Sequence, residues 1–189
     1  MKQLALDTQT FEILRNNKCV YVDKTEDIYR MITSGRIYFL SRPRRFGKSL
    51  LVSTLDSIFQ GKKDLFNGLY IYDKWKWEEY PVITIDWTGI NHSTPEDMKD
   101  SLVFNLTRIA RNYQITLTAK NASDCFIELI ESLHKQSGKK VVVLIDEYDK
   151  PITAHLTDSY LETIKKNVHD FYQVMKSSDK YLQFVFLTG

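Results

Sequence analysis

Two segments that lie far apart in the sequence constrain what this chain can fold into. Each begins with an apolar run that predicts a buried strand, at 37–40 in the first segment and 141–145 in the second. The first strand leads into Phe46-Gly47-Lys48-Ser49, which offers a lysine and a hydroxyl where a helix begins, and the second ends in Asp146 and Glu147. A lysine, a hydroxyl and two acids at strand ends are what holds a nucleoside triphosphate and one magnesium ion.

The loop after the first strand departs from the standard phosphate-binding pattern, because Arg42 stands where that pattern has its first glycine. Gly47 is kept, at a point where backbone must approach phosphate closely. Lys48 can reach the β- and γ-phosphates, and the Ser49 hydroxyl can ligate magnesium. A basic surface turn before a helix is the alternative reading of these residues. The residues expected to contact nucleotide are Arg44, Arg45, Phe46, Gly47, Lys48, Ser49 and Leu50.

A helix is predicted directly after this loop. Apolar residues recur at helical spacing from Leu50 to Phe59, and Gly61 follows as a stop signal. The helix would therefore direct its free N–H groups and the positive end of its dipole at the phosphates.

The acids of the second segment have distinct predicted roles. Five consecutive aliphatic residues before Asp146 are typical of a central parallel strand that is covered on both faces. Asp146 would hold magnesium, directly or through water, and Glu147 would polarise an attacking water. That water-activating group favours hydrolysis over phosphoryl transfer to a small molecule. A merely solvated Glu147 is the alternative, and Asp149 and Lys150 are either part of the site or a solvated turn.

Composition is consistent with a single α/β domain spanning residues 1–189. A chain of 189 residues with 43% hydrophobic and 13% aromatic residues can bury a core, and a net charge of +2 gives no general signature of polyanion binding. Cys19 and Cys125 are too few for a disulfide framework. No apolar run reaches the length of a membrane span and no secretory signal is visible, so a cytoplasmic location and no membrane partner are expected.

The remaining periodicities alternate as expected for a central parallel sheet flanked by helices. Further strands are predicted at 82–86 and 181–187. Further helices are predicted at 11–16, 25–33, from Thr94-Pro95 to Ala110, from Ser123 to Gly138, and over 161–175. Residues 62–80 are aromatic-rich and are expected to be irregular, with Trp75 and Trp77 packing against the edge of the core.

Three stretches carry a family resemblance. Tyr21-Val22-Asp23-Lys24-Thr25, the run from Arg42 to Leu50, and the run from Leu144 to Pro151 resemble the bacterial AAA-ATPase-like family, over nearly the whole chain. The resemblance implies a P-loop NTPase fold of the ASCE type that uses ATP and Mg²⁺. Members commonly carry a PD-(D/E)XK nuclease-like domain after the ATPase, and nucleic acid would be a partner through that domain.

The resemblance also bears on the last strand. In ASCE ATPases a polar residue at the tip of the strand beside the Asp-Glu strand senses the γ-phosphate, and Thr188 matches this position, with a simple Thr-Gly turn as the alternative. Such sheets usually continue with a fifth strand and a helical lid, which this sequence lacks. We therefore expect the front part of a longer protein, with an uncovered final strand that favours a homo-oligomer.

Other chemistries are weakly supported. The four histidines are scattered without metal-ligand spacing, and no serine lies in a nucleophile-elbow context. Asp23 and Lys24 either approach the adenine or, for Asp23, cap a helix. Three functions remain: an ATP-hydrolysing motor or switch for a C-terminal effector, a nucleotide-sensing regulatory module without significant turnover, and a small-molecule P-loop kinase.

Overall fold

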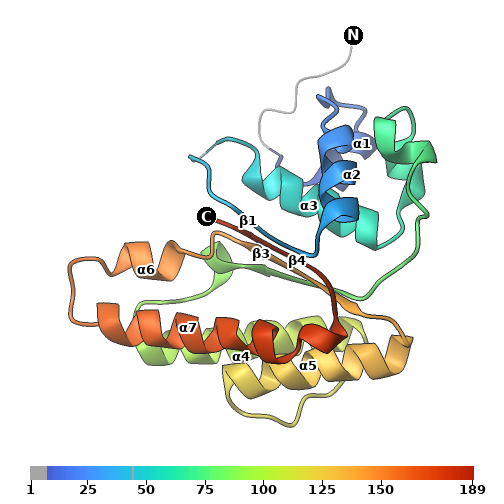
Figure 1. Cartoon of the computed structure of the whole chain (residues 1–189). Coiled ribbons are helices and arrows are strands. Elements are labelled where there is room, and N and C mark those ends of the chain that lie inside the picture. The colour runs from blue at the N-terminus through green and yellow to red at the C-terminus, as the bar shows by residue number, and fades with distance from the viewer. Residues whose placement is uncertain (1–7, 44) are drawn as a thin grey trace.

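The protein is a three-layer α/β structure in which helices cover both faces of one sheet (Figure 1). The computed structural model describes residues 8–43 and 45–189. One helical layer contains α1 (Phe11–Asn16), α2 (Thr25–Ser34) and α3 (Lys48–Phe59). The opposite layer contains α4 (Pro95–Asn112), α5 (Ala122–Ser137) and α7 (Leu161–Ser177). The short α6 (Lys150–Ala154) lies beyond the edge of the sheet.

The sheet has four parallel strands in the order β1-β4-β3-β2. Their bounds are β1 Ile37–Leu40, β2 Val82–Asp86, β3 Val141–Asp146 and β4 Leu182–Thr188. The predicted parallel sheet flanked by helices is confirmed. Because all four strands run in the same direction, their carboxyl ends meet at one edge of the sheet, where ligands bind in open α/β sheets.

Burial differs between the strands in a way that corrects two expectations. Every residue of β3 is buried, as predicted for a central strand. β1 is not a buried strand: it lies at the edge of the sheet, and Ile37 and Phe39 are 63% and 55% exposed. The expectation of an uncovered final strand is also wrong, because β4 lies between β1 and β3, with five of its seven residues buried.

Most predicted helices are confirmed, with local corrections. Thr94 caps α4 by accepting a hydrogen bond from the Asp97 amide at 3.1 Å, and Pro95 occupies the first turn. α5 begins at Ala122 instead of Ser123, because Asn121 accepts from the Asp124 amide at 2.9 Å. The segment predicted to be irregular contains two 3-10 helices, η1 (Lys63–Phe66) and η2 (Tyr70–Asp73), and α6 was not predicted.

Two hydrophobic cores hold the layers together, one on each face of the sheet. Alternation along β2 sends Ile83 and Ile85 to the core beneath α4, α5 and α7, and Val82 to the core beneath α1 and α3. Trp87 is fully buried in the first core, and Trp75 and Trp77 pack against the second, as expected. Within the described residues, no helix combines the length and the apolar character that a membrane crossing requires.

Candidate functional site at the carboxyl edge of the sheet

The loop between β1 and α3 brings a left-handed turn to the carboxyl edge of the sheet. Gly47 is the N-cap of α3 at φ +73°, a conformation that glycine adopts without steric cost, and Arg45 is also left-handed at φ +69°. A side chain added at Gly47 would meet no atom within 4 Å, so open space lies beside this backbone. The first amides of the twelve-residue α3 border that space.

The end of β4 holds the start of this loop. The Arg42 amide donates to the Gly189 carbonyl, and the Gly189 amide donates to the Leu40 carbonyl, both at 3.2 Å. A Cβ at Gly189 would lie 2.5 Å from the Tyr148 ring, so the close approach requires glycine. The loop is therefore fixed to two strands at its base.

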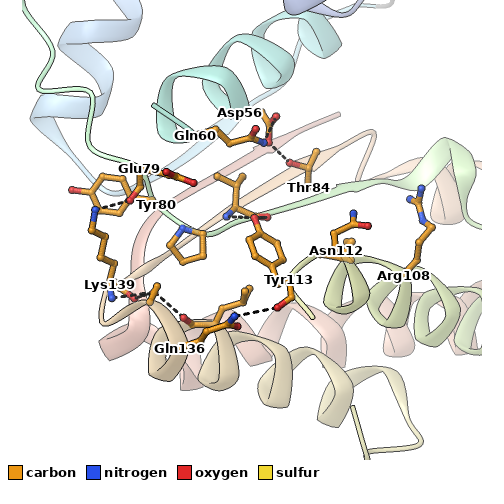
Figure 2. A pocket seen from close by; sticks show the side chains of 15 residues that line it. Asp56, Gln60, Glu79, Tyr80, Thr84, Arg108, Asn112, Tyr113, Gln136 and Lys139 are labelled. Carbon is orange, nitrogen blue, oxygen red and sulfur yellow. Dashed lines mark hydrogen bonds between the residues drawn. The ribbon is translucent and has the colours of Figure 1, made fainter. Parts of the chain in front are cut away.

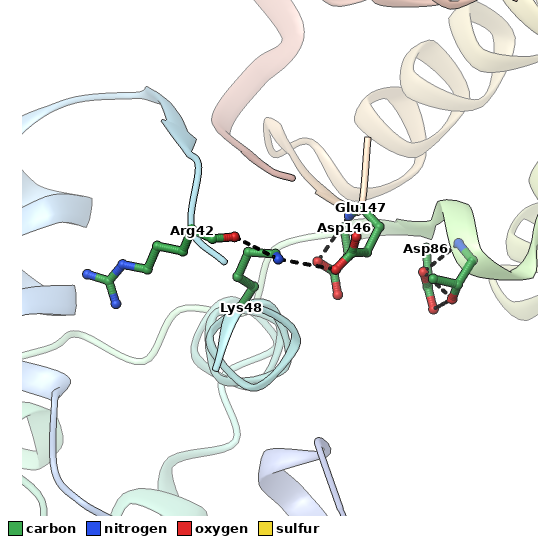
Figure 3. Close-up of polar contacts among 6 residues, drawn as sticks. Arg42, Lys48, Asp86, Asp146 and Glu147 are labelled. Atoms are coloured by element: carbon green, nitrogen blue, oxygen red, sulfur yellow. Dashed lines mark hydrogen bonds and ion pairs between the residues drawn. The ribbon is translucent and has the colours of Figure 1, made fainter. Parts of the chain in front are cut away.

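Lys48 lies at the centre of the site, on the first residue of α3 (Figure 3). Its side chain is buried, and its Nζ donates to the Arg42 carbonyl at 3.0 Å and lies 3.3 Å from Glu147 Oε1. The Arg42 side chain points away from it. An ammonium in this position is anchored on one side and faces the acidic tip of β3 on the other.

Asp146 ends β3 and is only 5% exposed. Burial raises the pKa of its carboxyl, and the charges of Asp86 and Glu147 act in the same direction. The Ser49 hydroxyl and the Glu147 amide act in the opposite direction, and that amide donates to Asp146 Oδ1 at 3.1 Å. A carboxylate held among other acids is a favourable position for a cation.

Glu147 occupies a strained backbone position. Its φ is +53°, in the left-handed region that side-chain-bearing residues seldom adopt. The kink follows the last residue of β3 directly and leaves the side chain 22% exposed beside the Lys48 ammonium. The carboxylate thus borders both the buried lysine and the solvent.

Thr188, at the tip of β4, is fully buried, and its hydroxyl has no hydrogen-bond partner among the described residues. Its carbonyl accepts from the Tyr148 amide at 3.0 Å, and its Cα is in register with Leu40. Because buried polar atoms are nearly always paired, the hydroxyl is available for a group that the protein itself does not supply.

Asp86 is a site residue that the sequence reasoning did not single out. It ends β2 in register with Asp146, and its carboxylate accepts from the Thr88 amide and hydroxyl. The signal was present in the sequence, since Asp86 is a polar residue at the tip of an apolar strand, as are Asp146 and Thr188.

A cavity of about 680 Å³ opens beside the loop, between it and the segment that leads into α2. Phe46, Gly47 and Leu50 line one side of the cavity, and Tyr21 and Val22 line another. Phe46 is 63% exposed. Arg44, predicted to contact nucleotide, lies outside the described residues.

The structure distinguishes between the alternatives for Asp23 and Lys24. Asp23 Oδ1 accepts from the amide and hydroxyl of Thr25, the first residue of α2, and its Oδ2 accepts from the Tyr70 amide. Asp23 therefore fixes the start of α2, whereas Lys24 lines the cavity. Asp149 is a half-buried turn residue directly before α6, and Lys150 is the first residue of that helix.

The residues present fit a nucleotide-bound magnesium ion. The Ser49 hydroxyl lies close enough to Asp146 to favour its charged form, so a hydroxyl and a carboxylate converge beside the loop. No cluster of three or more His, Cys, Asp or Glu side chains suited to a metal occurs in residues 8–43 and 45–189. Magnesium at phosphate sites is commonly held by one or two protein oxygens together with phosphates and water.

Comparison with known proteins gives two matches. The model of a family described as "Predicted AAA-ATPase" matches residues 5–189. An "Uncharacterized protein in vnfD 5'region" from Azotobacter chroococcum mcd 1 is 39% identical over 191 residues, which cover 100% of this chain and 37% of that protein. The chain thus spans well under half the length of this relative. No solved structure matches the chain significantly.

Proposed function

This chain belongs to the predicted AAA-ATPase family, and we propose that it binds ATP with magnesium and hydrolyses it. The observation that carries the proposal is that a buried lysine, an acidic strand tip and a buried hydroxyl without a partner among the described residues lie at the edge of the sheet that carries the glycine turn. These groups come from α3, β3 and β4, which are distant in the sequence. They supply positive charge for phosphate, oxygens for a metal and a hydroxyl for a terminal phosphate oxygen.

In the proposed complex, the β- and γ-phosphates occupy the open space beside Gly47. Lys48 and the α3 amides contact them, and Ser49 and Asp146 hold the magnesium ion, which would neutralise phosphate charge. The Thr188 hydroxyl would donate a hydrogen bond to the γ-phosphate. The raised pKa of Asp146 supports this assignment, because a divalent cation would stabilise the charged form that burial disfavours.

The nucleoside would occupy the neighbouring cavity. Aromatic and aliphatic side chains, including Tyr21, Phe46 and Leu50, give it walls suited to a base, and Lys24 gives it a polar rim. Its volume of about 680 Å³ is within the range of ligand pockets. The adjoining open space at Gly47 allows one molecule to span both regions.

Glu147 is the proposed water-activating residue. In the described state its carboxylate is paired with Lys48 at 3.3 Å. A γ-phosphate would compete for the Lys48 ammonium, and Glu147 would then be free to accept a proton from water. This exchange couples nucleotide binding to assembly of the catalytic base and favours hydrolysis over a kinase reaction.

The strand order supports the ASCE assignment, since β4 lies between the loop-bearing β1 and the acid-bearing β3. A motor or switch role for a nuclease-like effector is part of the proposal for the longer protein. A nucleotide sensor without significant turnover is the second candidate, because the Lys48–Glu147 pair gives the free state a defined arrangement that binding would disrupt.

The test is calorimetric titration with ATP and magnesium. Replacing Lys48 by alanine should weaken binding by about 1.5–3 kcal/mol, or roughly ten- to a hundredfold in Kd, the scale of a charge-assisted hydrogen bond. The matched control is Lys165→Ala, which removes a lysine paired with Glu162 on the surface of α7. Equal affinity of Lys48→Ala and the parent would refute the phosphate-site assignment.

A further inference from the structure

A groove runs along the outer edge of β2, from Asp86 beside the proposed nucleotide site to Tyr80 ahead of the strand, and Figure 2 shows its larger part. It consists of two cavities of about 750 and 510 Å³ that share Thr84 and Arg108. Asp56 of α3 and Gln60, which directly follows that helix, form one wall, and Asn105 and Arg108 of α4 form the other. We call this surface the β2-edge groove.

The floor of the groove is an unpaired strand edge. β2 pairs only with β3 among the described strands. Val82 shows which backbone groups face outward, since its amide donates to the Tyr113 hydroxyl at 3.0 Å and its carbonyl accepts from that hydroxyl at 2.9 Å. The two-residue period of a strand puts the N–H and C=O of Thr84 and the N–H of Asp86 on the same outer side, whereas the Asp86 carbonyl begins the 3-10 helix Trp87–Gly89.

Tyr113 marks one end of this free edge. One hydroxyl satisfies both outward groups of Val82, as a neighbouring strand would do, and its position leaves no room for a strand there. Beyond it, the Thr84 side chain turns aside to donate to Asp56 Oδ1 at 3.0 Å. The outward backbone from Thr84 to Asp86 is thus flanked by cavities and not by a side-chain cap.

We propose that the β2-edge groove binds an extended peptide segment of a partner protein, which adds to the sheet as a strand beside β2. The outward N–H and C=O of Thr84 and the outward N–H of Asp86 are complementary to another extended backbone, and strand addition uses this complementarity. A second copy of this chain could not bring its own β2 into contact, because that edge is recessed between α3 and α4. The occupant is therefore a single extended segment.

The walls of the groove indicate which side chains the segment carries. Arg108 borders both cavities, is exposed, and forms no ion pair or hydrogen bond with the other described residues. Asn105 has a buried Oδ1 without a partner on the same wall, and Phe104 next to it is 68% exposed. An acidic side chain near Arg108, an N–H donor near Asn105 and an apolar side chain against Phe104 fit this wall.

The experiment selects binders from a displayed library of random twelve-residue peptides, using the chain without nucleotide. The binders are then measured by fluorescence anisotropy. Thr84→Pro removes the outward N–H of Thr84, and an edge strand tolerates proline at such a position. The substitution should weaken peptide binding about tenfold. Thr84→Val keeps that N–H and should bind like the parent, and Arg108→Glu should weaken binding of acidic peptides.

A second measurement uses the parent protein alone, so it is independent of how the variants fold. Methylating each backbone nitrogen of a selected peptide in turn should abolish binding at the one amide that donates to the Thr84 carbonyl and should leave binding unchanged at the two neighbouring amides, because alternate amides face β2. Failure to select any binder, or binders indifferent both to Thr84→Pro and to the position of N-methylation, would overturn the proposal. Binding should persist in Lys48→Ala, which separates this result from the ATP proposal.

Discussion

Two aspartates, the buried Asp146 and the half-buried Asp56, have different surroundings. Burial raises the pKa of both carboxyls. Asp56 accepts side-chain hydrogen bonds from Thr84 at 3.0 Å and Gln60 at 2.7 Å, one on each oxygen. Asp146 has two acids near it, opposed by the Ser49 hydroxyl and by the amide of its neighbour Glu147.

The difference separates a structural carboxylate from one suited to a ligand. The partners of Asp56 tie α3 to β2, so its charge is compensated within the protein. The charge of Asp146 is opposed by Asp86 and Glu147, and its best compensation would come from a cation. Raised pKa values alone do not distinguish the two residues, whereas the identity of their neighbours does.

The largest expected effect is on turnover. Glu147→Gln should lower ATP hydrolysis by about 10²–10⁴-fold, since the amide keeps the shape but cannot act as a base. Phosphate release is the measurement, and calorimetry should show retained binding of ATP and magnesium. Equal turnover of the variant and the parent would remove Glu147 from the mechanism.

The next effect contrasts the two aspartates directly. Asp146→Asn should weaken magnesium-dependent ATP binding about tenfold or more, because a carboxylate charge at the metal is lost. Asp56→Asn makes the same chemical change away from the site and should leave ATP affinity unaltered. Calorimetric titrations with and without magnesium measure the ATP affinity of both variants. An equal loss of affinity in the two variants would show that Asp146 has no special role in metal binding.

A smaller effect is expected on stability. Asp56→Ala should lower the free energy of unfolding by about 1–3 kcal/mol, because Thr84 and Gln60 lose their acceptor. Thermal unfolding would register this as a fall in Tm of about 2–4 °C per kcal/mol for a chain of this size. An unchanged Tm would show that the α3–β2 hydrogen bonds contribute little.

The smallest effect concerns His155, an ionisable group whose two ring nitrogens both face acceptors. Nδ1 contacts Asp158 Oδ2 and Nε2 contacts the His92 carbonyl. The hydrogen bond to Asp158 raises the pKa of His155 above 6.5, against the effect of burial. The resulting stability is fully present below pH 6.5 and is lost as the pH rises through the folded-state pKa.

His155→Gln should therefore flatten the fall in the free energy of unfolding as the pH rises above 6.5, by about 1 kcal/mol or less, the scale of a partly exposed ion pair. The measurement is Tm against pH for the variant and the parent. Parallel pH profiles would show that the protonated His155 bridge does not contribute to stability.

The sequence predicted the central strand and the main helices because their signals are local. The all-aliphatic run before Asp146 and the helical spacing after Lys48 correspond to β3 and α3. The contact of Lys48 with Glu147, next to Asp146 in the sequence, is consistent with a general property of parallel sheets, whose carboxyl ends share one edge.

Other features depend on strand order and tertiary contacts, which local patterns do not encode. An apolar run such as 37–40 looks alike at the centre and at the edge of a sheet, so the exposure of Ile37 and Phe39 was missed. The position of Asp86 beside Asp146 could be predicted only with the knowledge that β2 pairs with β3. The unpaired edge of β2 was likewise visible only once the strands were ordered.

The insertion of β4 between β1 and β3 has a consequence for synthesis on the ribosome. β1 pairs through Ile37 with Val185, so among the described strands β1 has no neighbour in the sheet until β4 is made. Pairing over such a sequence separation is slow, and unpaired apolar strands are open to misassociation in the meantime. A nascent chain halted before residue 182 should therefore hold β2 and β3 together while the phosphate loop is still unformed.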